Sequence, residues 1–480
     1  MRVPISAIDL DMGTYPRKGI RQEVVEQYAD ALRGGAAFPP ILLENKTNKL
    51  LSGLHRIEAV EKVLKQPELW ENGHKPDGTI EADYLAAPES IPRKLFRASL
   101  DATHGLRLSP EETKALAREV YQANPDFKQK DCAKLLGVSN NSISRWVQDI
   151  LAARREERQH KAWKLQLLGW TEREIAQALN VSPATAHEDC SKSSEWKKSS
   201  NSLLSAGHPV EEVARRFNLS PLLVWAAHLK GKDDRARMGA LGWPIRTWDY
   251  WNWSDVDHRF GDEWDGRIPA QLVAHALYFF TRPGALVLDP MAGGGTVSDV
   301  CLAMGRRCRS YDMAARPERR PEIEEWRWDP KDLRWAPSAR EKPDLIFFDP
   351  PYYKKNEKEY GERSISALPR LDYLRFFREW AALAWANSKP ETRLALLEAD
   401  WRDFQSTPAL EEKPDEAVTL LDYVREVSPT GRGWQLTHRI ESPLSTERFT
   451  AGVVSAMQEA RILGAVSRTL LVFRRTHDSV

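Results

Sequence analysis

The sequence predicts a multidomain α/β protein, and three observations carry this prediction. From about residue 241 onward, strand-like and helix-like patterns alternate, which is typical of a mainly parallel sheet. Residues 113–235 show helical periodicity alone, and residues 1–112 mix short strands with amphipathic helices. We therefore expect an α+β domain over 1–112, an all-α domain over 113–235 and a doubly wound α/β domain over 236–480.

Composition places few limits on function. The chain has 480 residues and a net charge of +1, so any basic surface for nucleic acid must be local. The cysteines show neither disulfide nor metal-ligand spacing, and they are Cys132, Cys190, Cys301 and Cys308. The N-terminus has no signal-peptide pattern, and no apolar run reaches membrane-spanning length. We expect a cytoplasmic protein with no membrane association and no metal site.

The first domain contains a candidate anion site. Strands are expected at 3–8, 40–43 and 49–51, and helices at 22–32 and 56–64. The segment Leu51–Ala59 combines a strand, a turn at Gly53 and a helix that opens with His55 and Arg56. A helix N-terminus beside a guanidinium is suited to bind an anion.

The same segment resembles the N-terminal domain of the ParB/sulfiredoxin superfamily, and the resemblance extends to Tyr15–Arg17 and Asp101–Leu108. It implies contacts with the phosphates of CTP or ATP from Gly53, His55, Arg56 and Arg107. Sulfiredoxin chemistry is not expected, because Leu54 stands where the catalytic cysteine would be. His55 stands where ParB proteins usually carry a second arginine, so a scaffold or dimerisation surface stays open beside nucleotide binding. A domain of this kind also indicates a homodimer.

The helical middle contains an internal repeat. Leu136–Ser139, Leu179–Ser182 and Phe217–Ser220 each follow one amphipathic helix and precede another. In each segment Gly or Asn supplies a tight turn, an aliphatic residue plugs the angle between the helices, and Ser caps the second helix. The second copy adds a capping box at Thr171–Glu174. This pattern predicts three helix-turn-helix units.

The three units differ in their suitability for reading DNA. The first presumed recognition helix offers amides, a hydroxyl and a guanidinium to base edges and phosphates from Asn140, Asn141, Ser144 and Arg145. The second carries Glu188 and Asp189, which would repel phosphates, and the third, Pro221–Ala227, is apolar enough to pack against another domain. The polar stretch 191–200 is expected to form a hinge or a phosphate-contacting loop.

The last domain places a glycine-rich segment at the end of a buried strand. Strand 285–288 leads into Asp289–Thr296, and a helix is expected from Thr296 to Met304. The next strand, 307–311, ends at Asp312, about 20 residues beyond the loop, where an acidic residue commonly binds ribose hydroxyls. The loop is not Gly-x-Gly-x-x-Gly, which argues against a dinucleotide domain.

A second strand, 345–348, ends in the tetrapeptide Asp349–Tyr352. A carboxylate and a backbone carbonyl that accept the two N–H groups of an exocyclic base amine would localise its lone pair for attack on a methyl donor. Proline fixes φ and holds that carbonyl, and an aromatic residue can stack on a base rotated out of the duplex. The alternative is a strand-ending turn with a packed tyrosine. The polar run Tyr353–Leu368 is expected to be a mobile loop that closes over the substrate or contacts phosphates, with a solvated charged loop as the alternative.

These two motifs, in this order, resemble those of S-adenosylmethionine-dependent DNA amino-methyltransferases, which modify adenine N6 or cytosine N4. The resemblance covers about the last half of the chain and implies a Rossmann-like domain. It implies cofactor contacts from Asp289, Pro290, Ala292, Gly293, Gly295, Thr296, Asp312, Asp329 and Pro269. It implies catalytic roles for Asp349, Pro350 and Tyr352. Trp251 and its neighbours are expected near the methionine end of the cofactor, with a plain aromatic core as the alternative.

The sequence therefore favours a site-specific methyltransferase for double-stranded DNA, as in restriction–modification systems, with S-adenosylmethionine as cofactor. Adenine N6 is favoured over cytosine N4, because the tetrapeptide begins with Asp and ends with Tyr. Sequence reading is assigned to the first helix-turn-helix unit. Two alternatives stay open: an RNA amino-methyltransferase, and a ParB-like partition regulator with a nucleotide switch and a vestigial methyltransferase domain.

Overall fold

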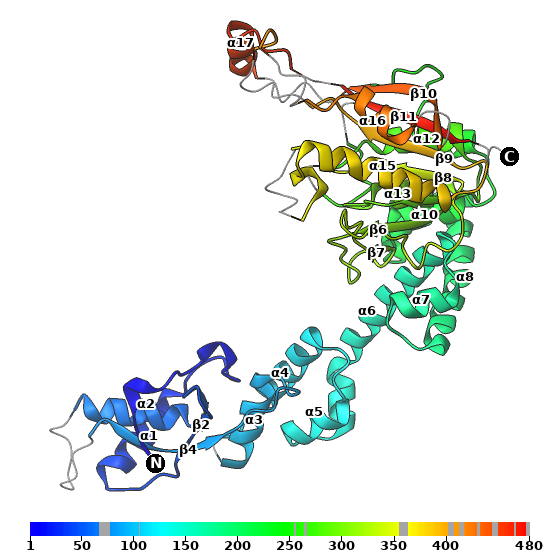
Figure 1. Cartoon of the computed structure of the whole chain (residues 1–480). Helices are drawn as coiled ribbons and strands as arrows, with labels where there is room; N and C mark the ends of the chain where they lie inside the picture. Colours follow the sequence, from blue (N-terminus) through cyan, green and yellow to red (C-terminus); the bar gives the residue numbers. More distant parts are fainter. Residues whose placement is uncertain are drawn as a thin grey trace. The chain divides into compact units, whose positions relative to one another are not determined.

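The computed structural model shows a mixed α/β protein with one four-stranded and one seven-stranded sheet (Figure 1). It describes residues 1–66, 77–104, 106–253, 256–263, 266–354, 363–401, 408–411, 417–429, 433–443, 450–464 and 467–476. The chain forms two compact units, Met1–Glu157 and Arg158–Val480. Helix α6 (Asn140–Leu167) begins in the first unit and ends in the second. The two predicted boundaries between the three domains stay a prediction.

The first unit contains the four-stranded sheet in the order β1-β4-β2-β3. Its strands are β1 (Arg2–Pro4), β2 (Ile41–Glu44), β3 (Leu50–Ser52) and β4 (Thr79–Leu85). Helices α1 (Gln22–Arg33) and α2 (Leu54–Leu64) pack against each other beside it. The expected strand over 3–8 is shorter, because pairing with β4 ends at Pro4 and Thr79. Two short 3-10 turns, Ile5–Ala7 and Met12–Thr14, follow instead.

The rest of the first unit is helical. Helices α3 (Arg93–His104), α4 (Pro110–Ala123) and α5 (Gln129–Leu136) enclose an apolar core with the first part of α6. Buried Leu116, Tyr121, Ile143 and Val147 belong to this core. These contacts hold the first helix-turn-helix pair, α5 and α6, against the helices that precede it.

The three predicted turns have the same backbone geometry. Gly137, Asn180 and Asn218 all have positive φ, at 65°, 51° and 52°. This left-handed conformation suits Gly and Asn, and it ends each first helix. The helices of the second and third units are α7 (Glu172–Ala178), α8 (Pro183–Ser205), α9 (Val210–Arg216) and α10 (Pro221–His228). The predicted repeat and the Thr171 capping box are confirmed.

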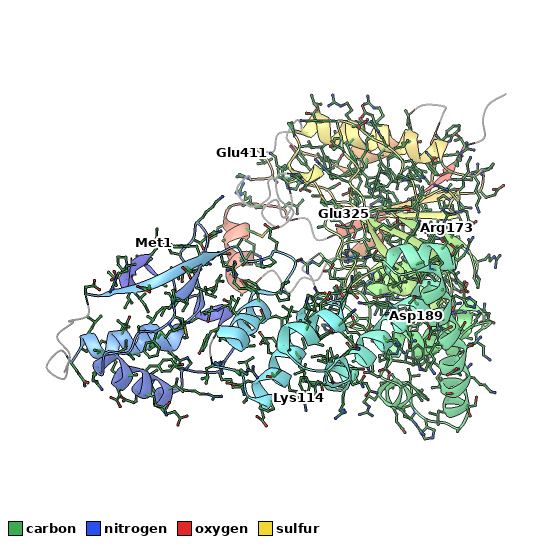
Figure 2. All side chains as sticks on the ribbon, turned by 90° about the horizontal axis from the view of Figure 1, so that it is seen from below. Met1, Lys114, Arg173, Asp189, Glu325 and Glu411 are labelled. Atoms are coloured by element: carbon green, nitrogen blue, oxygen red, sulfur yellow. The ribbon has the colours of Figure 1, made fainter. Side chains whose placement is uncertain are left out.

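The prediction of a hinge or loop over residues 191–200 was wrong. These residues lie within α8. Buried Ser193 and Trp196 give that helix an inward face despite its polar composition. One turn earlier, Asp189 is buried and accepts a hydrogen bond from Arg158 at 2.6 Å. Figure 2 labels Asp189 on this helix. A run of Ser and Lys residues therefore continues the helix where its small and aromatic residues face the core.

The second unit contains the seven-stranded sheet in the order β10-β11-β9-β8-β5-β6-β7. The bounds are β5 (Leu286–Asp289), β6 (Arg307–Asp312), β7 (Ile323–Glu325), β8 (Leu345–Phe348), β9 (Arg393–Glu398), β10 (Trp434–Pro443) and β11 (Ser467–Arg475). Strands β5 to β9 are parallel, and β11 runs antiparallel to both of its neighbours. Chain order reverses between β5 and β8, as in a doubly wound sheet.

Both faces of this sheet are covered. Val287, Leu345 and Phe347 face one core, which includes α12 (Ala270–Phe280) and α13 (Thr296–Met304). Leu288 and Phe348 face the other, which includes α15 (Arg370–Ala386) and α16 (Leu420–Val427). The short elements are α11 (Asp234–Ala240), a 3-10 turn (Ile365–Ala367) and α17 (Ala451–Glu459). None of the helices in the described part of the chain is long and apolar enough to cross a membrane.

The second and third helix-turn-helix units share the core of the seven-stranded sheet. Helix α10 packs on α13, and Leu222, Leu223 and Val224 are buried there. The third helix-turn-helix unit therefore packs against the helices of the large sheet within one compact unit, and its packing against a separate domain stays a prediction. In the second helix-turn-helix unit, Glu174 of α7 forms an ion pair with Arg309 of β6 at 3.1 Å.

Candidate active site

Acidic side chains end five adjacent strands of the large sheet. Asp312 and Glu325 end β6 and β7, Asp289 and Glu398 end β5 and β9, and Asp349 follows β8. Glu325, which Figure 2 labels, ends β7, the edge strand of the sheet. Because these strands are parallel, their carboxyl ends meet at one edge of the sheet. The two motifs that the sequence singled out therefore flank the point where strand order reverses, which is where such sheets bind ligands.

The glycine loop after β5 depends on its glycines. Gly293 and Gly295 have φ of 49° and 82°, in the region that side chains disfavour. Gly295 also lies against the guanidinium of Arg320, which donates a hydrogen bond to the Gly295 carbonyl at 2.8 Å. A Cβ on Gly295 would collide with that guanidinium. Helix α13 then begins at Thr296, at the residue that the sequence predicted.

A buried ionic cluster lies beside this loop and holds the helix that follows it. Lys164 of α6 donates to Asp299 at 2.9 Å and to Glu322 at 2.7 Å, and Arg320 donates to Asp299 at 3.1 Å. The neighbouring cations Arg320 and Lys164 outweigh the effect of burial and lower the pKa of Asp299 to about 2. The cluster joins the end of α6 to the start of α13, and no sequence motif marks it.

Asp312 is bound to the loop through its carboxylate. Its Oδ2 accepts the backbone N–H of Gly293 at 2.8 Å, and its Oδ1 accepts that of Ala314 at 2.8 Å. Each carboxylate oxygen can accept a further hydrogen bond. Asp312 is therefore oriented toward the cavity with acceptor capacity left for hydroxyl groups of a ligand.

Asp289 is buried, with only 1% of its surface exposed. Its Oδ2 atom has no hydrogen-bond partner among the described residues. Burial, reinforced by Cys308 and Asp349, raises the pKa of this carboxyl well above its usual range. A carboxyl held in this way would be ionised by a cationic ligand group beside it. The orphaned atom fits the ammonium group of an amino-acid ligand.

A cavity of about 300 Å³ connects these elements. Among the residues named from sequence, it is lined by Asp289, Pro290, Ala292, Gly293, Thr296, Asp312 and Asp349. Five others are not among its described lining residues: Gly295, Pro269, Asp329, Pro350 and Tyr352. Gly295 belongs to the glycine loop but does not contact the cavity. Arg267 and Ile268, the two residues before Pro269, line the cavity where Pro269 does not.

Asp329 is not among the described residues that line the cavity, so its predicted cofactor contact stays a prediction. Its carboxylate caps the backbone N–H of Lys331 at 2.9 Å and lies 3.4 Å from Arg327. Apolar side chains also line the cavity, among them Met313, Ile323 and Trp326. The sequence signal was the aromatic run at 326–328, whose Trp328 donates to the Pro290 carbonyl at 2.8 Å.

The tetrapeptide Asp349–Tyr352 lies at the cavity edge. Asp349 and Pro351 line it, and the Tyr352 hydroxyl lies 3.5 Å from Oδ1 of Asp349. Lys354 follows, with its ammonium 5.1 Å from the centre of the Trp401 ring. The predicted mobile loop falls largely on residues 355–362, which lie outside the described residues.

The tryptophan-rich segment around Trp251 forms an aromatic core. Trp251 is 2% exposed and stacks on Phe279 at 5.9 Å between ring centroids, with His275 at 5.3 Å. It is not among the described residues that line the large cavity. The alternative interpretation of this cluster therefore fits better than a cofactor contact.

The candidate anion site of the first unit is a cavity of about 80 Å³, lined by Gly53, His55 and Arg56 among others. Arg56 is buried, and its Nη1 donates to the carbonyls of Pro39 and, at 2.8 Å, Pro40. Nε2 of His55 accepts the backbone N–H of Arg21 at 3.1 Å. Arg107 is exposed and does not line this cavity in the described part of the chain.

The predicted DNA-contacting residues lie on the first turns of α6. Asn140, Asn141, Ser144 and Arg145 are all exposed. Ser139 caps the helix by accepting the backbone N–H of Ser142 at 3.1 Å. The opposite side of the same turns buries Ile143 and Val147. The four polar side chains therefore share the solvent face that a recognition helix would present.

Comparisons with known proteins show distant structural similarity only. No family model and no curated protein matches the sequence. TrmN from Thermus thermophilus aligns with 18% identity and a TM-score of 0.24 over 44% of this chain, which spans about half of TrmN (49%). The S-adenosylmethionine-dependent methyltransferase SibL aligns with 14% identity and a TM-score of 0.21, over 70% of this chain and 100% of SibL.

The chromosome-partitioning protein ParB from Caulobacter crescentus, truncated at its C-terminus and complexed with CTP-gamma-S, also aligns. Identity is 16% and the TM-score is 0.17, over 39% of this chain and 97% of that chain.

Proposed function

We propose that the protein is an S-adenosylmethionine-dependent DNA methyltransferase that modifies an exocyclic base amine, with adenine N6 as the favoured target. One observation carries the proposal: a single cavity is lined by the glycine loop, by Asp289 with its unpartnered Oδ2 atom, by the oriented carboxylate of Asp312 and by Asp349. The first three fit an amino-acid nucleoside, and the fourth fits an amine that is to be methylated.

The cavity residues divide the cofactor between them. Asp289 would hold its ammonium group, Asp312 its ribose hydroxyls, and Met313, Ile323 and Trp326 its adenine ring. When bound, the sulfonium centre supplies an activated methyl group, so that no strongly basic residue is needed to start the reaction. The small, left-handed glycines let the backbone approach the cofactor closely.

Asp349 accepts one N–H of the target amine, and the carbonyl of Pro350 accepts the other. Together they draw the nitrogen lone pair out of the ring, in the direction of the methyl donor. Tyr352 stacks on the base and, with its hydroxyl 3.5 Å from Asp349, limits the positions that this carboxylate adopts. After transfer, the amine nitrogen gives its extra proton to Asp349, and from there the proton passes to solvent.

Double-stranded DNA is the proposed substrate, because α6 exposes two amides, a hydroxyl and a guanidinium on the first turns of a helix-turn-helix unit. The other two units are built into the core of the large sheet, which leaves less of their surface for a groove. We assign recognition of the DNA sequence to the first helix-turn-helix unit, α5 and α6.

The deciding experiment measures methyl transfer from labelled S-adenosylmethionine to duplex DNA, single-stranded DNA and RNA, followed by mass spectrometry of the nucleosides. N6-methyladenine in duplex DNA is the expected product. If a product formed only in RNA, the proposed substrate would be RNA instead of DNA. If the product were N4-methylcytosine, the proposed target base would be cytosine instead of adenine. An Asp349→Ala preparation serves as the control for contaminating enzymes. Cofactor binding without any product would favour the partition-regulator alternative.

A further inference from the structure

Glu398 lies beside the catalytic motif, although no motif marks it in the sequence. Strand β9, which it ends, pairs in parallel with β8, and Leu396 lies opposite Phe348. Asp349 and Glu398 therefore end neighbouring strands that are about 4.8 Å apart. Glu398 is 0% exposed, and no ion pair to it is found in the described part of the chain. A carboxyl is thus buried next to a catalytic carboxylate without a compensating cation.

Two buried tyrosines connect Glu398 to the motif. The Tyr373 hydroxyl, from α15, lies 3.5 Å from Oε1 of Glu398 and donates to the Pro351 carbonyl at 3.1 Å. It also lies 3.2 Å from the Tyr423 hydroxyl, which comes from α16. Both tyrosines are fully buried. A chain of polar groups therefore runs from Glu398 through Tyr373 to the backbone of the catalytic tetrapeptide.

The hydrogens in this chain bear on its protonation state. Glu398 also hydrogen-bonds to Tyr423, so each tyrosine hydroxyl has one hydrogen that it can donate to the carboxyl. The Pro351 carbonyl competes with Glu398 for the hydrogen of Tyr373. An ionised Glu398 would attract that hydrogen, because hydrogen bonds to charged acceptors are stronger, and the Pro351 carbonyl would lose its donor. A neutral Glu398 instead donates to the Tyr373 oxygen and leaves the Tyr373 hydrogen on Pro351.

We propose that Glu398, as a neutral carboxylic acid, is a positioning residue for methyl transfer that fixes the Asp349–Tyr352 turn through Tyr373. The inference rests on the proposed function and deepens it. The chemical work is divided between two neighbouring carboxyls: Asp349 accepts from the substrate amine, while Glu398 carries a proton and orders the backbone behind it.

The electrostatics agree with this division. Burial, and then the negative charge of Asp349, raises the pKa of Glu398 well above its usual range. The titratable groups that face it are Asp349 after β8, Tyr373 of α15 and Tyr423 of α16, and Tyr352 lies close to Tyr373. Ionisation of both adjacent carboxyls is unfavourable, because the two negative charges repel each other. Asp349 lines the cavity and is therefore better solvated than Glu398.

Three variants test the role by activity. Glu398→Gln keeps a neutral hydrogen-bonding group, so kcat at neutral pH should stay within about threefold of the wild type. Glu398→Ala should lower kcat at least tenfold. Tyr373→Phe should lower it about 2- to 10-fold, since the Pro351 carbonyl loses its donor. The dissociation constant for S-adenosylmethionine should stay unchanged in all three. Tyr121→Phe removes a buried hydroxyl in the first unit and is the control.

The pH profile separates positioning from packing. Ionisation of Glu398 at alkaline pH should reduce the wild-type kcat, and Glu398→Gln should abolish that decline. A decline of the same size in the Gln variant would overturn the proposal, as would a Gln variant as inactive as the Ala variant.

A spectroscopic measurement is independent of activity. With ¹³C-labelled glutamate, the carboxyl signal lost in Glu398→Gln should report a neutral acid at pH 7, and an ionised signal would overturn the proposal. If the wild type transferred no methyl group, the proposed function would fail, and this signal would still decide the protonation state.

Discussion

Gly293 donates its backbone N–H to Oδ2 of Asp312 over 2.8 Å, and this bond ties the loop after β5 to the end of β6. The backbone N–H of Ala292 adds a second link, to the Tyr311 carbonyl at 2.8 Å. The loop and the acidic residue therefore form one preorganised surface. Neither can shift without disturbing the other.

Replacement of Asp312 should weaken cofactor binding. Asp312→Ala removes the acceptors for ribose hydroxyls and leaves the Gly293 and Ala314 N–H groups without their partner. Loss of hydrogen bonds to a charged group costs about 1.5–3 kcal/mol, or roughly 10- to 150-fold in Kd for S-adenosylmethionine. Isothermal titration calorimetry would measure this. Asp332→Ala, on an exposed turn, is the matched control, and equal affinity for both variants would contradict the assignment.

Replacement of Asp349 should stop the reaction and spare cofactor binding. Asp349 lines the same cavity as Asp312, but the glycine loop is bound by Asp312. Loss of one preorganised electrostatic group typically reduces kcat on the order of 10²- to 10³-fold. Single-turnover methylation together with calorimetry would separate the two effects. If Asp349→Ala lost cofactor affinity as severely as Asp312→Ala, Asp349 would have to be reassigned to cofactor binding.

Substitution on α6 should relax sequence selectivity. Asn141→Ala or Arg145→Ala removes an exposed donor from the presumed recognition face. A base contact contributes about 1–3 kcal/mol, so the preference for the methylated site should fall about 5- to 150-fold. Sequencing of methylated positions in a random duplex library would report it. Arg173→Ala, on the exposed side of the second unit, is the control (Figure 2), and an unaltered preference would remove the first unit from sequence reading.

Arg56 should contribute to the stability of the first unit, whether or not CTP or ATP binds there. Its guanidinium donates hydrogen bonds to the carbonyls of Pro39 and Pro40, and Arg56→Ala would leave both carbonyls without that donor. The expected loss is about 2–4 kcal/mol in the free energy of unfolding. Urea unfolding, repeated with CTP and with ATP, would measure it. A variant that unfolds like the wild type but no longer responds to nucleotide would instead assign Arg56 to the ligand.

Local sequence signals predicted much of this fold. The start and end of α13, the whole of β8 and the Thr171 capping box follow from short-range chemistry, namely a glycine turn, a buried apolar run and a Thr–Glu pair. The three turns follow from residues that tolerate positive φ.

Long-range placement could not be predicted in the same way. Asp329 follows an aromatic run that is shared with the cavity wall, yet it turns outward to cap Lys331. Glu398 follows an apolar run, as Asp349 does, but only the strand order reveals that it lies beside the tetrapeptide. The helical path of residues 191–200 depends on Trp196 reaching a core built by other helices.

His275 makes the stability of the second unit sensitive to acid. It is fully buried in α12, and its Nδ1 lies 2.7 Å from the Gln271 carbonyl while its Nε2 accepts the Arg246 N–H at 3.1 Å. Both ring nitrogens are therefore satisfied in the neutral form, and burial lowers the pKa of His275 to about 4. In the unfolded chain the pKa is about 6.5, so the unfolded state binds the proton first as pH falls.

Stability from His275 is therefore complete above pH 6.5 and declines as pH falls toward 4. The expected loss is about 2 kcal/mol between pH 7 and pH 5, from 1.4 kcal/mol per pH unit over the 1.5 units below 6.5. Urea unfolding at both pH values should show a smaller decline for His275→Gln, which cannot be protonated but keeps an acceptor for Arg246. His187→Gln, at an exposed position, should decline like the wild type. Equal declines in all three proteins would show that another buried group controls the acid sensitivity.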